Sequence, residues 1–199
     1  LDAINSAVEV FKGQQLSHGN MSFTIDNKQI ISQIGGIGNQ ITINDEQILK
    51  NTQSIQKKLN LPVSSDLDGL NFTVEMETGT GKTYVYIRTI YELNKNYGFK
   101  KFVIVVPSIA IKEGVVKNLE ITKEHFDRVY NKTPLNYWVY NSKHVSKLRN
   151  FAVSNNIEIL VINIDSFTKS DNIINNSNDK MTGKKPIEFI RETNPIMII

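Results

Sequence analysis

Glu77-Thr78-Gly79-Thr80-Gly81-Lys82-Thr83 is the stretch of this sequence that decides the fold. It follows the apolar run 72–76 and opens a segment in which apolar residues recur at helical spacing. A strand, a glycine-rich turn and Lys-Thr at the start of a helix are the layout of a phosphate-binding loop. We therefore expect a strand over 70–76 and a helix over 83–94, with a nucleoside triphosphate bound at the turn.

Each residue type in this loop has a chemical reason to be there. Gly79 and Gly81 allow main-chain angles that a Cβ would hinder, so that backbone amides can point at an anion beside a helix start. Lys82 can reach the β and γ phosphates as a point charge. The Thr83 hydroxyl can ligate Mg²⁺, which keeps most of its water and takes few protein ligands. The loop predicts a triphosphate bound together with Mg²⁺.

The loop departs from the full signature, and the departure is informative. Counting back through G-x-x-x-x-G-K-[ST] places Met76 where the first glycine is expected. Nucleotide kinases and GTPases usually keep that glycine, whereas helicase-type loops often lack it. Glu77 could serve as a base, but we interpret it as a residue that shapes the turn.

Composition bounds the class of protein without naming it. The 199 residues are 40% hydrophobic, which suits one globular domain or part of a larger one. The 23 basic and 20 acidic residues give a formal charge of +3, which permits contact with nucleic acid without arguing for it. There is no cysteine, and the three histidines have no metal-ligand spacing. With no signal peptide or membrane-length apolar run in this sequence, we expect a cytoplasmic protein with no membrane partner.

The first part of the chain reads as a lead-in to the loop. Apolar spacing predicts a helix over 2–12. Two β-like pieces, 21–25 and 40–43, flank the glycine cluster 35–39, which we expect to be a hairpin turn rather than a ligand loop. Asn44 has the properties of a helix cap, with acidic residues after it and lysines near residue 58, so a helix is expected to run to about Leu59.

From residue 70 onward, strand and helix patterns alternate. This order predicts an α/β fold with a parallel sheet, helices on both faces and ligands at the carboxyl ends of the strands. We divide the chain into a lead-in, 1–69, and a first ATP-binding domain, 70–199. The elements expected in the second part are strands at 102–106, 137–140, 157–164 and 196–199, helices at 107–119, 143–152 (capped by Ser142) and 186–192, and a surface loop at 170–185.

Three strings in this order resemble one family. They are Met76-Glu77-Thr78-Gly79-Thr80-Gly81-Lys82-Thr83-Tyr84-Val85-Tyr86, Val105-Val106-Pro107-Ser108-Ile109-Ala110-Ile111-Lys112-Glu113-Gly114 and Ile162-Asn163-Ile164-Asp165-Ser166-Phe167. They are similar to the restriction (Res) subunit of type III restriction–modification enzymes, which are superfamily 2 helicase-like motors. The similarity extends to 67–72 and to the first helix, so it covers most of the chain.

The resemblance implies a RecA-like P-loop motor domain and a set of roles. In that family, ATP hydrolysis drives translocation or switching on double-stranded DNA, a Mod-type methyltransferase subunit supplies site recognition, and a separate nuclease domain cuts. The implied enzyme is the ATP hydrolase subunit of a site-specific endodeoxyribonuclease. Its phosphate and Mg²⁺ ligands would be Thr78, Gly79, Thr80, Gly81, Lys82 and Thr83, with Lys82 also catalytic and Thr83 also on the metal.

The second string would be the helicase motif that contacts the DNA backbone. Pro107 and Ser108 stand at a strand-to-helix junction, where free amides and a hydroxyl can bind a phosphate. Lys112 follows one turn later and can add charge. The alternative is that Ser108 only caps the helix and that Lys112 is solvated.

The third string would be another DNA-side motif, with Ser166 as its contact residue. The alternative is an ordinary helix cap beneath which Phe167 packs into the core. Nearby, the residues Lys143, Lys147 and Arg149 make the expected helix 143–152 basic, and we interpret them as a solvated face.

The chain also departs from the family. The acidic (Walker B) motif should follow the strand 196–199, and the adenine-reading Gln and the second motor domain are not recognised either. We therefore expect a fragment that by itself binds nucleotide weakly and hydrolyses no ATP. Another superfamily 2 helicase, a P-loop phosphotransferase and a nucleotide-gated scaffold stay open as alternatives. The pattern assigns no chemical role to residues 14–60, nor a DNA site, a polarity or a stoichiometry.

Overall fold

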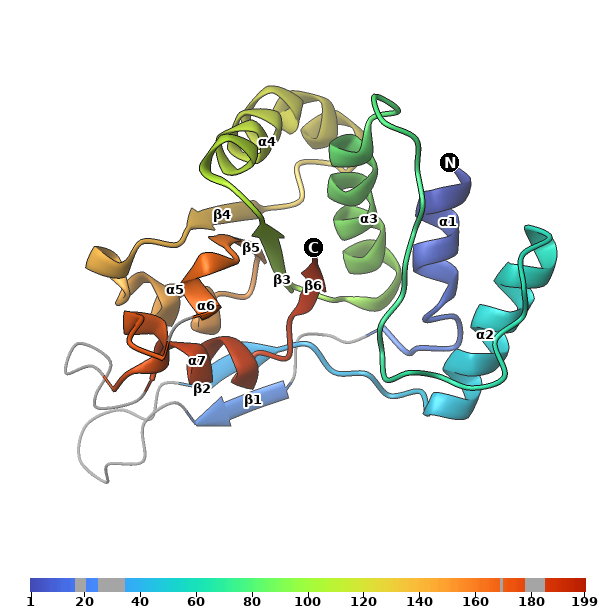
Figure 1. Ribbon diagram of the computed structural model, residues 1–199, viewed down its shortest axis with the longest axis horizontal. Coiled ribbons are helices and arrows are strands. Elements are labelled where there is room, and N and C mark those ends of the chain that lie inside the picture. The colour runs from blue at the N-terminus through green and yellow to red at the C-terminus, as the bar shows by residue number, and fades with distance from the viewer. Residues whose placement is uncertain (17–20, 25–34, 169, 178–184) are drawn as a thin grey trace. The chain divides into compact units, whose positions relative to one another are not determined.

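The computed structural model describes residues 1–16, 21–24, 35–168, 170–177 and 185–199 (Figure 1). The chain forms two compact units, and each is described by itself. The first consists of Leu1–Leu16 and Ile41–Gly98, and the second of Ser17–Gln40 and Phe99–Ile199. The proposed domain boundary between residues 69 and 70 falls inside the first unit and stays a prediction.

The first unit is helical in its described elements. They are α1 (Asp2–Glu9), α2 (Asp45–Lys58) and α3 (Lys82–Tyr97). α1 packs on both α2 and α3, and the Tyr97 hydroxyl donates a hydrogen bond of 2.9 Å to the Val8 carbonyl. The first predicted helix is present but shorter than expected, because the chain leaves the α-helix after Glu9 and turns at Gly13, where φ is +96°.

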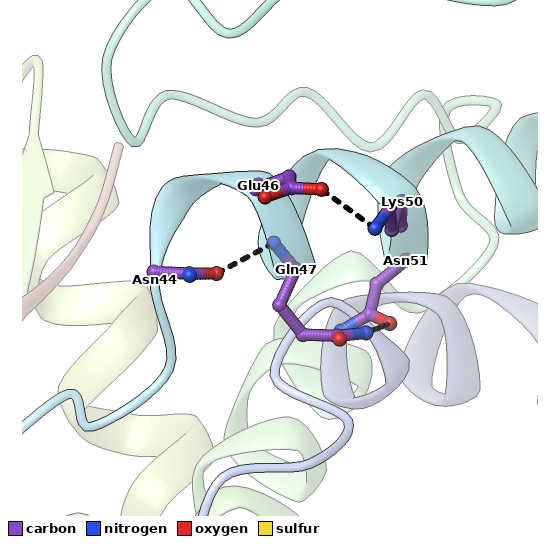
Figure 2. A network of polar contacts seen from close by, with 5 residues as sticks. All are labelled: Asn44, Glu46, Gln47, Lys50 and Asn51. Atoms are coloured by element: carbon purple, nitrogen blue, oxygen red, sulfur yellow. Dashed lines mark hydrogen bonds and ion pairs between the residues drawn. The ribbon is translucent and has the colours of Figure 1, made fainter.

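The start of α2 confirms the predicted cap (Figure 2). The Asn44 side chain accepts a hydrogen bond of 2.9 Å from the Gln47 amide. Lys50 pairs with Glu46 one turn earlier at 2.7 Å, and the Gln47 amide group donates to Asn51 at 3.0 Å. Such contacts one helical turn apart stabilise an exposed helix start by a few tenths of a kcal/mol each, roughly 0.2–0.5.

The strand expected over 70–76 is not present, so that prediction is wrong. Residues 71–77 have no regular structure, and the apolar side chains of Leu70, Phe72 and Val74 are exposed. None of the described strands pairs with this segment. Alternating apolar residues favour a strand, but a strand forms only where a neighbouring chain takes up its amides and carbonyls.

A parallel sheet forms the centre of the second unit. Its strands are β3 (Lys101–Val106), β4 (Leu135–Val139), β5 (Ile157–Asn163) and β6 (Ile196–Ile198), in the order β4-β5-β3-β6. All three pairings are parallel. β3 is buried throughout, and β5 is buried along all but its last residue, which is why both appear in the sequence as nearly continuous apolar runs.

Helices flank this sheet, as the alternating pattern predicts (Figure 1). They are α4 (Ile109–Val129), α5 (Lys147–Val153), α6 (Asp165–Thr168) and α7 (Pro186–Glu192), with 3₁₀ turns η1 (Ser142–His144) and η2 (Ile173–Asn175). Val103 and Leu160 belong to a core cluster that also holds Phe151 of α5 and Phe189 of α7. α4 packs against β3 and β5.

The glycine cluster is a strand rather than a turn, which corrects the prediction for this region. β2 (Gly35–Gly38) pairs antiparallel with β1 (Met21–Thr24), and the second strand expected at 40–43 is absent. Residues 25–34 lie outside the described chain. A Cβ on Gly38 would come within 2.9 Å of the Thr193 carbonyl oxygen, so this strand needs glycine because another backbone approaches it closely.

Two further boundaries differ from the sequence prediction. Ser142 does not cap a helix that continues to residue 152. Instead, the Asn141 side chain caps η1, and α5 begins only at Lys147. α4 continues ten residues beyond the expected end at Leu119, to Val129. The region 170–185 contains η2, and residues 169 and 178–184 are not among those described.

Asn39 ties the segment after β2 to the start of β3. Its buried side chain donates to the Lys101 carbonyl at 2.7 Å and accepts from the Lys100 and Lys101 amides at 2.8 and 3.0 Å. The Asn39 amide also donates to the Thr193 carbonyl at 2.8 Å. Each of these bonds satisfies a backbone group that would be costly to bury alone.

Lys101 is fully buried and donates through its ammonium group to the carbonyls of Phe151 and Ser154 at 2.5 and 2.6 Å. Burial lowers the pKa of Lys101 to about 8, against the attraction of Glu158. Glu158 is also buried and accepts hydrogen bonds from the Asn136 amide and the Trp138 indole. This polar network lies at the amino ends of the strands, away from the edge where ligands are expected.

Candidate nucleotide and nucleic-acid sites

The segment 77–83 forms a turn that leads directly into α3. Gly79 and Gly81 have φ of +81° and +84°, and Gly81 is the N-cap of the helix. These left-handed conformations cost an L-residue with a Cβ about 1–2 kcal/mol. The two glycines at these positions therefore have the conformational role that the sequence predicts.

Bonds within the turn fix its shape. The Glu77 carbonyl accepts from the Thr80 amide at 3.4 Å and from the Thr80 hydroxyl at 2.6 Å. The Val85 amide donates to the Gly81 carbonyl at 3.0 Å, which begins the helical ladder. Glu77 acts here through its main chain, as expected of a residue that shapes the turn. The hydroxyl of Thr80 is engaged inside the loop, which the sequence pattern did not indicate.

The loop exposes backbone amides and a lysine at the start of α3. The first amides of an α-helix have no carbonyl one turn before them and carry the positive end of the helix dipole. Residues 77–82 are exposed, and a Cβ at Gly79 or Gly81 would meet nothing within 4 Å. In the described chain, Lys82 forms no ion pair. These residues therefore fit an anionic ligand.

Thr83 is half-buried in the first turn of α3, next to Tyr86. Burial raises the pKa of the Tyr86 phenol, and the Thr83 hydroxyl opposes that shift. The buried Tyr86 hydroxyl nevertheless has no hydrogen bond of normal geometry to any described residue. The Thr83 hydroxyl thus lies beside the Tyr86 phenol at the start of α3.

In the second unit, Ser108 stands between β3 and α4. Its side chain accepts from the Ile111 amide at 3.3 Å, and its carbonyl accepts from the Lys112 amide at 3.0 Å. Ser108 is thus the helix cap that the alternative reading expected, and it lies next to the exposed Pro107. A capping hydroxyl is still able to donate its proton to a phosphate. Lys112 is half-buried one turn into the helix.

Ser166 lies in the short helix α6, directly after β5. Its carbonyl accepts from the Asn172 side chain at 3.0 Å, and the Asn163 side chain accepts from the Asp165 amide at 2.8 Å. Phe167 packs against the core cluster. The packing of Phe167 thus follows the alternative reading, but the side chain that caps this turn is that of Asn163.

The structure brings Ser108 and Ser166 to one edge of the sheet. β3 and β5 are parallel neighbours, and the Ile164 amide donates to the Val106 carbonyl at 2.9 Å, so both chains leave the sheet side by side. Pro107 and Lys112 belong to the same junction. The loop at 77–83 belongs to the other compact unit and is described within it alone.

The described residues contain no group of three or more His, Cys, Asp or Glu side chains placed to hold a metal ion. The helices described include none long and apolar enough to span a membrane.

The parallel sheet flanked by helices is the architecture of a RecA-like α/β domain, and a glycine-rich turn at a helix start accompanies it. Residues 40–199 match the family described as type III restriction enzyme, res subunit. The chain belongs to this family, which supports an enzyme with a helicase-like ATPase domain.

Curated relatives agree with this assignment. The chain is 32% identical to the EcoP15I Res subunit of Escherichia coli, over 80% of this chain and 19% of the relative. It is 34% identical to the StyLTI Res subunit of Salmonella typhimurium, over 66% of this chain and 15% of the relative. It is 37% identical to the EcoPI Res subunit of Escherichia phage P1, over 54% of this chain and 12% of the relative. The chain thus spans less than a fifth of each of these relatives.

Proposed function

We propose that this chain is the ATP-binding part of a DNA-dependent translocase in a type III restriction endonuclease. The observation that carries the proposal is the loop of two left-handed glycines at the start of the 16-residue helix α3. In a chain of the Res family, a helix start of this kind supports a bound nucleotide. In this proposal, the protein uses ATP hydrolysis to translocate or to switch conformation on DNA before the DNA is cleaved.

The residues of the loop divide the work of holding ATP and Mg²⁺. The amides around Gly79, Gly81 and Lys82 would bind phosphate oxygens, and the Lys82 ammonium would offset the charge that builds up during phosphoryl transfer. The Thr83 hydroxyl would ligate the metal, and Thr78 and Thr80 complete the loop. Bound Mg²⁺ neutralises charge on the phosphates.

DNA is the proposed partner of the sheet edge in the second unit. Ser108 and the amides beside Pro107 would bind the phosphate backbone, with charge from Lys112 and a further contact from Ser166. Contacts of this kind position DNA without reading its sequence. A Mod-type methyltransferase subunit is the proposed source of site recognition.

The test is the ATPase rate of the complete protein to which this chain belongs, assembled with its methyltransferase subunit. The rate should be measured with and without duplex DNA. We expect strong stimulation by DNA and loss of that activity in Lys82→Ala. Lys95→Ala is the matched control, because Lys95 is an exposed lysine in the last turn of the same helix.

The outcomes separate the alternatives. A rate that depends on Lys82 but is indifferent to DNA would contradict the translocase and favour a nucleotide switch or a transferase. If Lys82→Ala and Lys95→Ala have the same ATPase rate, the loop takes no part in ATP hydrolysis.

A further inference from the structure

An exposed basic segment follows β4 and has no part in the function proposed above. We call residues 141–147, Asn-Ser-Lys-His-Val-Ser-Lys, the basic turn. β4 and β5 are parallel neighbours, and the Tyr140 amide donates to the Val161 carbonyl at 2.9 Å. The basic turn therefore leaves the sheet at the same carboxyl edge as Ser108 and Ser166.

The stretch of chain around this turn is basic. Residues 135–157 contain no Asp or Glu, but they include Lys143, Lys147 and Arg149. This stretch therefore has a formal charge of +3. A local excess of one sign is the electrostatic mark of a surface that binds an anionic polymer.

The two lysines of the turn are not neutralised within the described protein. Neither Lys143 nor Lys147 forms an ion pair with a described residue. The acid next in sequence, Glu158, is buried and bonded to Asn136 and Trp138. The Lys147 ammonium lies 5.8 Å from the centre of the Trp138 ring, a contact that holds the lysine without cancelling its charge.

The backbone beneath these lysines is fixed. The Asn141 side chain accepts from the Lys143 amide at 2.9 Å, and its carbonyl accepts from the His144 amide at 2.9 Å. Val145 is buried in the core cluster, while Lys143, His144 and Lys147 are exposed. A charged surface whose backbone is already ordered loses less entropy when it binds.

We infer that the basic turn binds phosphates of duplex DNA and extends the contact surface formed by Ser108, Lys112 and Ser166. The loops that carry them leave three neighbouring strands, β4, β5 and β3, and strands lie about 4.8 Å apart, so the loops start within roughly 10 Å of one another. This inference rests on the proposed function, because it names more of the surface that would hold the same DNA.

The experiment measures binding of the complete protein to a short fluorescent duplex without a recognition site, over a series of salt concentrations. For the double variant Lys143→Ala, Lys147→Ala we expect weaker binding. The plot of log K against log salt has a negative slope. We expect this slope to become less steep by about one for each lysine that contacts a phosphate. Lys57→Ala, Lys95→Ala removes two exposed helical lysines elsewhere and should leave the slope unchanged. Lys143→Arg, Lys147→Arg should bind DNA like the native protein.

Each other result would overturn the inference in a recognisable way. If the double alanine variant keeps native affinity and slope while the native protein binds DNA, the basic turn is not a DNA contact and the proposed function stands. If the native protein does not bind the duplex at all, both proposals fail. If the variant binds DNA normally but loses the methyltransferase subunit, the turn contacts a protein instead.

Discussion

Gly81 and Gly114 differ in backbone conformation, so replacing each with alanine tests how that conformation affects stability. A Cβ at either position would meet nothing within 4 Å, but Gly81 has a φ of +84° whereas Gly114 lies inside α4. We expect Gly81→Ala to lower the free energy of unfolding by about 1–2 kcal/mol. Gly114→Ala should raise it by about 1 kcal/mol, since alanine favours a helix interior. Urea unfolding of the two variants measures both, and destabilisation by both would contradict the assignment of strain to Gly81.

Lys101 should make stability depend on pH in the alkaline range. Its pKa is lowered from 10.5 to about 8 in the folded protein, so the unfolded chain binds more protons between these values. The free energy of unfolding should therefore rise with pH across this window, by at most about 3 kcal/mol, and be unaffected by this group below it. Lys101→Met should lose that rise.

The native protein and Lys101→Met contain the same tyrosines. The difference between their two profiles of unfolding free energy against pH therefore removes the contribution of the tyrosines. Lys117→Met, at an exposed position on α4, is the control and should follow the native profile. Urea unfolding from pH 7 to pH 11 gives the free energy of unfolding of both proteins. If it changes with pH in the same way in the native protein and in Lys101→Met, burial does not lower the pKa of Lys101.

At the residue scale, the sequence predicts the backbone conformation of the loop and the cap of α2 well, and buried polar contacts poorly. Gly79, Gly81 and the cap Asn44 follow from local rules, because the backbone near each residue decides its role. Lys101 and Asn39 do not, since their partners are distant in the chain. A lysine before an apolar strand looks like an exposed flank, and nothing local shows that it is buried.

At the start of α4, a single substitution can distinguish the two roles of Ser108, which are to cap the helix and to bind DNA as proposed. Asp caps a helix as well as Ser does, but its charge repels phosphate. We expect Ser108→Asp to keep native stability and to weaken binding of duplex DNA, whereas Ser108→Ala should cost about 1 kcal/mol of stability. Thermal unfolding and DNA titration of the complete protein distinguish the two effects.

The control for that variant is Asn44→Asp, which makes a similar replacement at the cap of α2. It should change neither stability nor DNA binding appreciably. If Ser108→Asp binds DNA as the native protein does, Ser108 is only a cap.

The sequence correctly predicts those elements whose own residues mark them, either by a continuous apolar run or by a proline at the helix start. The apolar runs at β3 and β5 and the Pro-initiated helix α7 are examples. The strand at 70–76 and the turn at 35–39 were predicted wrongly, because pairing with another strand decides each of them. The segment 71–77 has no paired neighbour, while the glycine cluster has one in β1.

For the whole molecule, nucleotide binding should appear as added stability. A ligand that binds the folded state alone raises the free energy of unfolding by about 2.7 kcal/mol at one hundred times its Kd. We expect Mg²⁺ with a non-hydrolysable ATP analogue to raise the unfolding temperature of the complete protein, and EDTA to reduce that shift. In Lys82→Ala the shift should be much smaller. An equal shift in the variant would place the nucleotide at a different site.

The bonds of Asn39 have a consequence during synthesis on the ribosome. Asn39 bonds to Lys101, 62 residues later, and Asn194 reaches back to it across 155 residues. At 5–20 residues per second, translation leaves Asn39 without its β3 partner for roughly 3–12 s, and without Asn194 for roughly 8–31 s. The glycine-rich strand β2 is therefore synthesised long before the chain that satisfies it, so a nascent chain that ends before these partners presents, once β2 has left the ribosome, an unfinished edge that a chaperone could bind.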